Sequence, residues 1–258
     1  MEDKGFQKVW ELVKKLRGPQ GCPWDKEQNH YTLLPYLIEE VYEVANAVEK
    51  GDVEDLKEEL GDLLFMVFSY ISIAEEKNLF RLKEVIDVVM RKMVARHPHV
   101  FGGKKLKTSQ DVVNHWHKIK DEERKKKKKS IMDNIPRNIS ALIRAKLVQE
   151  RASRVGFDWK SAQDAFLKVK EEIKEIEQLL YKSQSQEKLQ EEIGDLLFAV
   201  VNVIRLLNID PEITLRETIE KFIQRFKYIE SKITEQNKSL HEVTLDEMES
   251  LWKESKRI

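Results

Sequence analysis

The residues with the clearest chemical potential are two sets of four carboxylates. In each set, Glu-x-x-Glu is followed by Glu-x-x-Asp after 15 or 16 intervening residues. The sets are Glu40, Glu43, Glu59 and Asp62, and then Glu172, Glu175, Glu192 and Asp195. Residues three apart share one face of a helix, so two helices can gather each set into one group. Such a group of oxygen ligands is typical of a site for a divalent cation.

The neighbours of these acids favour a metal site over a solvated surface. On a helical projection, Glu59 and Asp62 fall among apolar residues such as Met66. Glu192 and Asp195 have the same kind of neighbours. Carboxylates in apolar surroundings are unfavourable unless they are paired, and oxygen ligands without His or Cys favour Mg²⁺ or Mn²⁺. The alternative is an ordinary solvated helix face, and the recurrence in both halves argues against it.

A di-iron carboxylate bundle is the competing metal site. Such a site takes Glu-x-x-His from two helices, and none of the six histidines falls within the acidic motifs. The pairs His97 with His99 and His115 with His117 do not recur in the other half of the chain. We therefore expect these histidines in loop packing or at the surface.

The acidic motifs belong to a longer repeat of about half the chain. Basic and aromatic pairs, spaced four residues apart, recur in the same order: Lys92 and Arg96 with Lys221 and Arg225, then Trp116 and Lys120 with Trp252 and Lys256. This pattern predicts a duplicated domain, over residues 1–120 and 136–258, with a linker over 121–135. The five consecutive lysines Lys125–Lys129 fall in this linker, and we expect a solvated charge run there rather than a nucleic-acid site.

Few residues interrupt helices in this chain. Gly and Pro account for 15 of 258 residues, about half the usual share, which argues against β-sandwiches and barrels and predicts an all-α fold. Helices are expected over residues 1–17, 32–50, 52–77, 82–96, 109–124, 139–151, 162–181, 187–207, 215–234 and 245–256, with Thr32 as one N-cap. Gly61 and Gly194 recur inside the motif helices, which predicts a close approach there.

Charge, hydropathy and cysteine content exclude further classes. Lys plus Arg and Asp plus Glu both number 46, so a strongly basic nucleic-acid binder is disfavoured, and no specific nucleic-acid partner is expected. The longest apolar runs, 63–74 and 193–207, are shorter than a membrane span of ~20 residues, and no membrane association is expected. The single cysteine, Cys22, and an N-terminus without an apolar leader favour the cytoplasm.

Taken together, these motifs resemble those of the all-α nucleoside triphosphate pyrophosphohydrolases, and more closely those of the two-domain MazG family. Besides the eight acids, the resemblance rests on Gly21-Cys-Pro-Trp-Asp25, Arg96-His-Pro-His-Val-Phe101 and Val155-Gly-Phe-Asp-Trp159. It covers essentially the whole chain. Each metal-ligand position of the family pattern carries the expected acid in both halves.

The resemblance implies an assembly and a reaction. Each repeat is expected to pair with its copy in a second chain to complete a four-helix bundle, which makes the protein a homodimer. The implied reaction is the hydrolysis of nucleoside triphosphates to the monophosphate and pyrophosphate, with Mg²⁺ or Mn²⁺. The implied substrates are ribo- and deoxyribonucleotides, including non-standard ones, in a house-cleaning role.

The resemblance also assigns roles to residues. The eight acids would hold the metal, and Glu171 and Glu39 would orient or deprotonate the attacking water. The cations of the repeated pairs would bind the triphosphate: Lys92, Arg96, Lys221 and Arg225. The repeated tryptophans would stack on the base, each with a lysine one turn later: Trp116 with Lys120 and Trp252 with Lys256.

Two other functions stay open at this point. One is a helical regulator that binds nucleotides without turnover. The other is a narrow pyrophosphohydrolase that acts on dUTP or dCTP. The sequence does not decide whether one half or both halves are active, because both halves keep all four acids.

Overall fold

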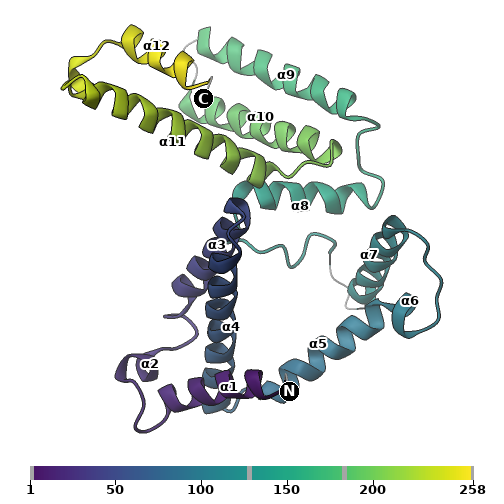
Figure 1. The fold of residues 1–258 in the computed structure, drawn as a ribbon. Coiled ribbons are helices and arrows are strands. Elements are labelled where there is room, and N and C mark those ends of the chain that lie inside the picture. The colour runs from purple at the N-terminus through teal and green to yellow at the C-terminus, as the bar shows by residue number, and fades with distance from the viewer. Residues whose placement is uncertain (1–2, 127–129, 182–184, 257–258) are drawn as a thin grey trace. The chain divides into compact units, whose positions relative to one another are not determined.

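The computed structural model describes residues 3–126, 130–181 and 185–256 (Figure 1). Within these residues the chain forms helices, turns and loops, and no β-strand, so the all-α prediction is confirmed. Residues 127–129 of the predicted lysine linker lie outside the described residues. None of the described helices combines the length and the apolar character that a bilayer crossing requires.

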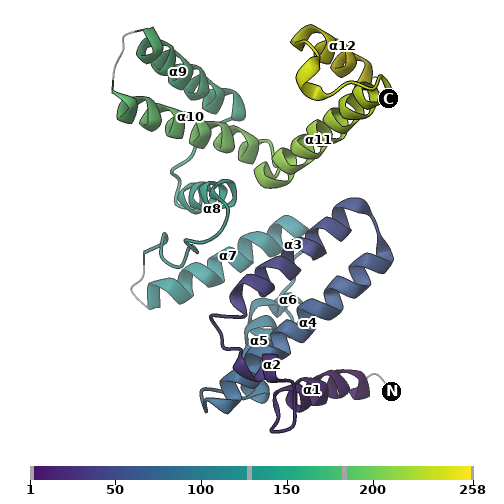
Figure 2. The ribbon, with the colours of Figure 1, turned by 90° about the vertical axis from the view of Figure 1, so that its left-hand side faces the viewer.

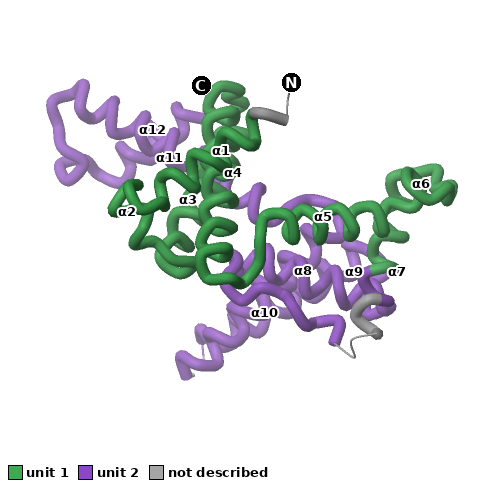
Figure 3. The backbone as a smooth tube through the Cα atoms, turned by 90° about the horizontal axis from the view of Figure 1, so that it is seen from below, with its two compact units in different colours: residues 1–119 green, residues 120–258 purple. Residues whose placement is uncertain are grey.

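The chain divides into two compact units, residues 1–119 and 120–258 (Figure 3). The first part of the chain contains α1 (Asp3–Arg17), α2 (Pro23–Glu27), α3 (Leu34–Lys50), α4 (Val53–Glu76), α5 (Leu82–Arg96), α6 (Pro98–Phe101) and α7 (Ser109–Lys126), which ends past the division. Unit 2 continues with α8 (Ala141–Ser153), α9 (Ala162–Tyr181), α10 (Gln186–Leu206), α11 (Pro211–Glu235), η1 (Leu240–Glu242) and α12 (Leu245–Ser255). In each unit a long helical hairpin, α3–α4 or α9–α10, follows a shorter helix (Figure 2).

Most predicted helix boundaries agree with the structure within a few residues, and the exceptions have local causes. The N-cap predicted at Thr32 is wrong, because the Thr32 hydroxyl accepts a hydrogen bond from the Asn29 N–H at 2.8 Å and closes a turn before α3. Helix α11 begins four residues before its predicted start. Pro211 is tolerated at its first position, and the carboxylate of Asp210 caps the two following N–H groups. The short helices α2 and α6, which also start at proline, were not predicted.

A tight turn and a buried cluster hold α3 against α4. Gly51 ends α3 in the left-handed conformation, with φ of 69°, which glycine adopts without strain. Asp52 then caps α4 by accepting two backbone hydrogen bonds. Leu33, Met66 and Ile73 pack together between the two helices. The hairpin therefore sets the acidic faces of α3 and α4 opposite each other.

A second cluster anchors the C-terminal half of α4. Val13 of α1 packs against Phe68 and Ile71 of α4, with Leu82 and Val85 of α5 at the edge. This core lies beyond the motif acids along α4. This core therefore does not extend to the acidic half of the hairpin.

Unit 2 repeats the arrangement around α9 and α10. Ala165 and Val169 of α9 and Ala199 and Val201 of α10 are buried. Helix α8 packs across α10 and α11, and α12 folds back on α11. The pairing of α9 with α10 corresponds to that of α3 with α4.

Several faces of the motif helices are open in the single chain. A helical projection of α3 places Val41, Val44 and Val48 on one side, which predicts that they face the core. Val41 and Val48 are 50 % and 58 % exposed, and Phe222 of α11 is 55 % exposed. The prediction that Val41 and Val48 face the core is therefore wrong within one chain. A Cβ atom added at Gly61 or Gly194 would contact nothing within 4 Å beyond its own helix. The predicted close approach at these glycines is thus also wrong within the chain.

An ion pair ties α11 to α8, which helps to place α11 in unit 2. The Lys146 ammonium lies 2.7 Å from the Asp210 carboxylate. Burial opposes ionisation of Asp210, but the bonds from Lys146 and from the backbone N–H groups of α11 outweigh it and lower the pKa of this carboxyl. A lowered carboxyl pKa stabilises the fold above the unfolded pKa of ~3.9, and this stability is lost as the pH falls through the folded pKa.

We expect Asp210→Asn to lower the free energy of unfolding by about 0.5–1 kcal/mol at pH 7, because asparagine keeps the cap and loses a partly solvated ion pair. The difference in unfolding free energy between the parent protein and this variant should shrink as the pH falls toward about 3. Urea unfolding at both pH values measures it. Asp210→Ala serves as the comparison, because it also loses the cap and should cost about 1 kcal/mol more. A deficit that is independent of pH would contradict the role of the ion pair.

Candidate functional site

Three of the predicted acids converge in unit 2. Glu172 of α9 meets Glu192 and Asp195 of α10, with one carboxylate oxygen of each within 4.8 Å of the others. Glu172 is only 3 % exposed, and its Oε2 is buried without a hydrogen-bond partner in the described chain. Glu175 lies outside this triad and contacts Glu192 by a hydrogen bond. A buried carboxylate oxygen without a partner indicates that something else binds there.

The equivalent triad in unit 1 differs in one member. Glu40 and Glu43 of α3 meet Glu59 of α4 within the same 4.8 Å. The Oε2 atom of Glu40 is again buried without a partner among the described residues. Asp62 lies outside this triad, although its charge acts on Glu40. Neither cluster includes a histidine of the described chain, so the geometry does not support the di-iron alternative.

Electrostatic repulsion in both clusters favours a bound cation. Burial and then the charge of Asp62 raise the pKa of Glu40. Burial, the hydrogen bond with Glu175 and the charges of the neighbouring acids raise the pKa of Glu192. A proton or a metal ion relieves this repulsion. Because all the donors are carboxylate oxygens and one oxygen in each triad is orphaned, the residues fit a hard divalent ion such as Mg²⁺ or Mn²⁺.

A lysine that the sequence analysis did not single out contacts the triad of unit 2. The Lys168 ammonium lies 2.8 Å from a carboxylate oxygen of Glu172 and 2.8 Å from one of Glu171. These hydrogen bonds hold the pKa of Lys168 above its usual range. The sequence contained enough information to predict this contact of Lys168, because residues three and four apart on a helix are neighbours. The equivalent position in unit 1 is Tyr36.

A cavity of about 750 Å³ opens beside the triad of unit 2. Glu172 and Asp195 line its acidic part, and Phe157, Trp159 and Phe198 give it aromatic walls. Its volume lies within the range of small-molecule sites, roughly 300–1,000 Å³. Acids at one side and aromatic rings at another suit a ligand with both an anionic group that binds a metal and a flat ring.

The corresponding cavity of unit 1 measures only about 310 Å³. Ten positions that line the two cavities correspond at offsets of 132 or 133 residues: Arg17 with Gln149, Trp24 with Phe157, Asp25 with Asp158, Leu33 with Ala165, Tyr36 with Lys168, Glu40 with Glu172, Asp62 with Asp195, Phe65 with Phe198, Met66 with Ala199, and Ser69 with Asn202. Leu33 and Met66 are larger than Ala165 and Ala199, which accounts for the smaller cavity in unit 1.

The comparison with known proteins agrees with this duplicated site. The family model of the MazG nucleotide pyrophosphohydrolase domain matches residues 28–101 and again residues 160–229. These two segments include all eight motif acids. The chain belongs to the MazG family. The match confirms the resemblance drawn from the motifs and the enzyme class, a nucleotide pyrophosphohydrolase, that it implied.

Individual relatives cover nearly the whole chain. A Thermotoga maritima protein named nucleoside triphosphate pyrophosphohydrolase/pyrophosphatase MazG is 39 % identical over 251 residues, which span 97 % of this chain and 95 % of that protein. An Escherichia coli K12 nucleoside triphosphate pyrophosphohydrolase is 42 % identical over 252 residues, 95 % of each chain. The Bacillus subtilis protein YabN is 40 % identical over 251 residues, which make up only 51 % of its length.

In this MazG-family chain, the repeated tryptophans each contact an arginine. The Arg96 guanidinium lies 5.1 Å from the ring centroid of Trp116, and that of Arg225 lies 5.5 Å from Trp252. The pairs join α5 to α7 and α11 to α12 in the same way. Each arginine therefore covers part of a ring that was predicted to stack on a base.

The predicted substrate-binding and catalytic residues do not line the two cavities within the described part of the chain. Five of these residues are half-buried: Arg96, Trp116, Lys120, Arg225 and Trp252. The other five are exposed: Glu39, Lys92, Glu171, Lys221 and Lys256. A single chain therefore does not bring its predicted phosphate-binding cations onto the wall of either cavity.

A polar network on the cavity wall of unit 2 was missed by sequence reasoning. Arg205 of α10 binds Asp158, with Nη1 at 3.1 Å from Oδ2, and donates from Nε to Asn202 Oδ1 at 2.9 Å. Asp158 belongs to a motif that resembles the MazG family. Its partner lies 47 residues away in sequence, and no local pattern indicated it.

Proposed function

We propose that the chain hydrolyses nucleoside triphosphates to the monophosphate and pyrophosphate with Mg²⁺ or Mn²⁺ as cofactor. Membership of the MazG family supports the reaction class. The observation that carries the proposal is the orphaned Oε2 of the buried Glu172, in a carboxylate triad of which two members, Glu172 and Asp195, line a nucleotide-sized cavity. Ribo- and deoxyribonucleotides, including non-standard ones, are the proposed substrates, and the proposed role is house-cleaning of the nucleotide pool.

The residues of unit 2 have separate roles in this reaction. Glu172, Glu192 and Asp195, with Glu175 beside them, would hold the cation, and unit 1 has the equivalent set Glu40, Glu43, Glu59 and Asp62. When bound, the cation supplies positive charge at the phosphate oxygens. A water oxygen attacks the α-phosphorus, the bond to the bridging oxygen of the β-phosphate breaks, and pyrophosphate leaves.

The proton of the attacking water needs an acceptor near the cation. Glu171 is exposed next to Glu172, and we assign it this role, with Glu39 as its counterpart in unit 1. The hydrogen bond from Lys168 orients Glu171. A carboxylate held in one orientation acts as a general base when it lies within hydrogen-bond reach of the water.

Unit 2 is the proposed catalytic half. Its cavity is more than twice as large as that of unit 1, and Lys168 adds a cation at its edge where unit 1 has Tyr36. In unit 1 all four acids are present, but Leu33 and Met66 line the cavity beside Glu40 and Asp62. Residues 1–120 and 136–258 are the proposed domains, joined by a linker over 121–135.

Product analysis tests the proposed reaction. Full-length protein is incubated with GTP or dGTP and Mg²⁺, and the products are separated by ion-exchange chromatography. Pyrophosphate with the monophosphate is expected; orthophosphate with the diphosphate, or no product, contradicts the proposal. Tight nucleotide binding without turnover would instead favour the non-catalytic regulator. A panel of the standard ribo- and deoxyribonucleotides separates a broad enzyme from a dUTP- or dCTP-specific one.

A homodimer is the proposed assembly, in the cytoplasm. Helix α5 has no buried residue, and Phe222 and Val48 are more than half exposed. Burial of such side chains against a second copy is favourable, at roughly 25 cal/mol per Å² of apolar surface. The pairing would complete the two bundles and could bring Lys92, Arg96, Lys221 and Arg225 toward bound phosphates. Light scattering should give twice the chain mass of 30.5 kDa, and the mass of a single chain would contradict this assembly.

A further inference from the structure

One buried amide in unit 2 has a free acceptor that the proposed reaction does not use. Gln149 of α8 is 6 % exposed and lines the 750 Å³ cavity. Its Nε2 donates to the Phe198 carbonyl oxygen at 2.8 Å. Because a carbonyl oxygen accepts and cannot donate, the NH₂ end of this amide must face Phe198. The Oε1 end is buried without a hydrogen-bond partner among the described residues.

A second amide on the same cavity wall is oriented just as firmly. Asn202 Oδ1 accepts hydrogen bonds from Nε and Nη2 of Arg205, at 2.9 and 2.7 Å. Arg205 is itself held by Asp158. Since the oxygen of Asn202 faces the guanidinium, its NH₂ group faces away from it, and Asn202 lines the cavity. The wall therefore carries one fixed acceptor and one fixed donor.

The spacing along α10 places this pair away from the metal end of the cavity. Asp195 of the triad and Asn202 lie seven residues apart on the same helix, or about 10 Å along its axis. Both line the cavity, with Phe198 and Ala199 between them. A nucleotide has its base separated from the α-phosphate by the sugar. The base of a substrate whose phosphates bind at Asp195 therefore reaches toward Asn202 and Gln149.

We propose that Gln149 and Asn202 recognise the hydrogen-bonding edge of the substrate base. Oε1 of Gln149 accepts from an N–H or amino group of the base, and the NH₂ group of Asn202 donates to a neighbouring ring nitrogen or carbonyl oxygen. Phe157 and Trp159 lie on the same cavity and contact the flat face of the ring. Bases with an N–H donor beside an acceptor are accepted, and a base without a donor is rejected. This inference rests on the proposed function.

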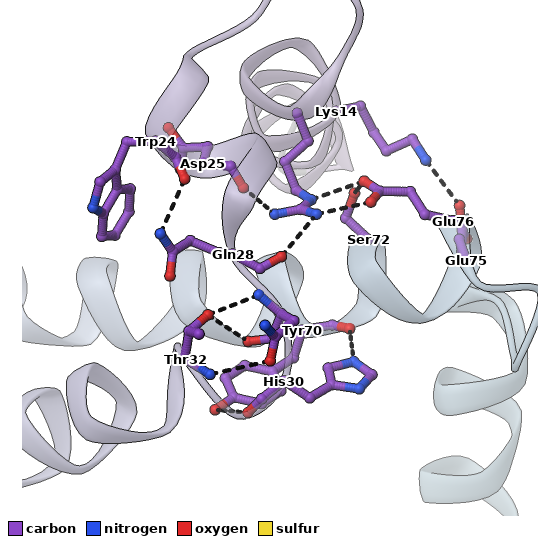
Figure 4. Close-up of polar contacts among 12 residues, drawn as sticks. Lys14, Trp24, Asp25, Gln28, His30, Thr32, Tyr70, Ser72, Glu75 and Glu76 are labelled. Atoms are coloured by element: carbon purple, nitrogen blue, oxygen red, sulfur yellow. Dashed lines mark hydrogen bonds and ion pairs between the residues drawn. The ribbon is translucent and has the colours of Figure 1, made fainter.

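The equivalent positions of unit 1 lack this pair. Arg17, which replaces Gln149, has no acceptor atom. Its guanidinium binds the Asp25 and Gln28 carbonyl oxygens and the Glu76 carboxylate, and Figure 4 shows these three residues with the dashed lines of the contacts. Ser69 replaces Asn202. The arginine of unit 1 therefore holds a loop, and base recognition is assigned to unit 2 alone.

Three substrates test the proposal in the full chain. All variants carry Glu40→Gln, so that only unit 2 can turn over. Pyrophosphate release is measured with ATP, with purine riboside triphosphate, which lacks the amino group, and with ribose 5-triphosphate, which lacks the base. The parent should prefer ATP to purine riboside triphosphate in kcat/KM by roughly 10- to 100-fold, because a buried acceptor left unpaired is costly.

The two substitutions have different expected signatures. Gln149→Met should lower kcat/KM for ATP by the same roughly 10- to 100-fold and leave the other two substrates unchanged. Asn202→Asp keeps the acceptor for Arg205, removes the donor and adds a carboxylate charge beside that guanidinium, so it should weaken both purine nucleotides more than ribose 5-triphosphate. The matched control is Gln163→Met, the same change at an exposed glutamine of α9, which should change nothing.

Equal losses on ATP and ribose 5-triphosphate would show a structural role for Gln149 and overturn the proposal. An unchanged kcat/KM for ATP in Gln149→Met would also overturn it. If the parent releases no pyrophosphate from any substrate, the proposed function fails on its own. The same three-ligand comparison is then made on dissociation constants by calorimetry, and the expected pattern is identical.

Discussion

Glu172→Gln is expected to lower the turnover of nucleoside triphosphates by about 10³-fold while leaving the metal-free fold intact. Charge stabilisation by a catalytic cation contributes several kcal/mol to the barrier, and each factor of ten in rate corresponds to about 1.4 kcal/mol. Glu172 is the most buried acid of the triad, and its orphaned Oε2 is the oxygen that most needs a cation. Glutamine keeps the shape and removes the charge that binds the metal.

Stability and activity should respond in opposite directions. The glutamine removes one of three like charges within 4.8 Å, so the melting temperature without Mg²⁺ should stay constant or rise. The rise in melting temperature on adding MgCl₂ should shrink, because a ligand stabilises only the state that binds it. Lys168 keeps Glu171 as its partner. Pyrophosphate release and melting curves with and without MgCl₂ measure both effects.

The matched variant in unit 1 is Glu40→Gln, which has the same chemistry beside a smaller cavity. It should leave most of the turnover in place, because unit 2 is the proposed catalytic half. A large loss in Glu40→Gln with little loss in Glu172→Gln would transfer catalysis to unit 1. Full activity in the double variant would remove the acids from the reaction altogether.

The motif acids were predictable because their relation is local. Spacing of three along a helix determines a shared face without any knowledge of the fold, and the repeat doubled the signal. The contact of Lys168 with Glu171 and Glu172 follows the same rule. The hydrogen bond of Gln149 could not be predicted from the sequence, because it is not local. Its partner Phe198 lies 49 residues away, and only the packing of α8 on α10 brings them together.

Apolar periodicity showed which helix faces avoid water, but not what covers them. Val41 and Val48 lie on the apolar stripe of α3, yet they are 50 % and 58 % exposed in the chain. The contact of each arginine with a tryptophan was equally hidden, because the arginine and the tryptophan had been singled out in two separate repeated pairs, each with a lysine. Arg225 and Trp252 contact each other across α11 and α12, and helix spacing alone does not give that angle.

Ala199→Met is expected to lower kcat/KM by roughly 100-fold, the second large effect. Ala199 lies between Phe198 and Asn202 on the cavity wall, and Met66 occupies the equivalent position in the smaller cavity of unit 1. The longer side chain would enter the space assigned to the substrate. A clash or a displaced ring that costs about 3 kcal/mol in transition-state binding lowers kcat/KM by roughly 100-fold.

The control is Val200→Met, a similar increase in side-chain length at the next residue of the same helix, on an exposed face. It should leave kcat/KM unchanged. The MgCl₂-dependent rise in melting temperature should survive in Ala199→Met, because the triad is untouched. Full activity in Ala199→Met with a bulky purine nucleotide would mean that the substrate does not occupy this cavity.

The converse substitution separates the size of the cavity from its chemistry. Met66→Ala should enlarge the cavity of unit 1 and destabilise the fold by about 2–5 kcal/mol, because Met66 is 6 % exposed and packs in a core with Leu33 and Ile73. In a Glu172→Gln background it should not restore turnover, because Arg17 still offers no acceptor to a base. Recovered turnover would show that volume alone distinguishes the two units. Continued inactivity with a measurable Mg²⁺ response would assign the difference to the polar wall that only unit 2 has.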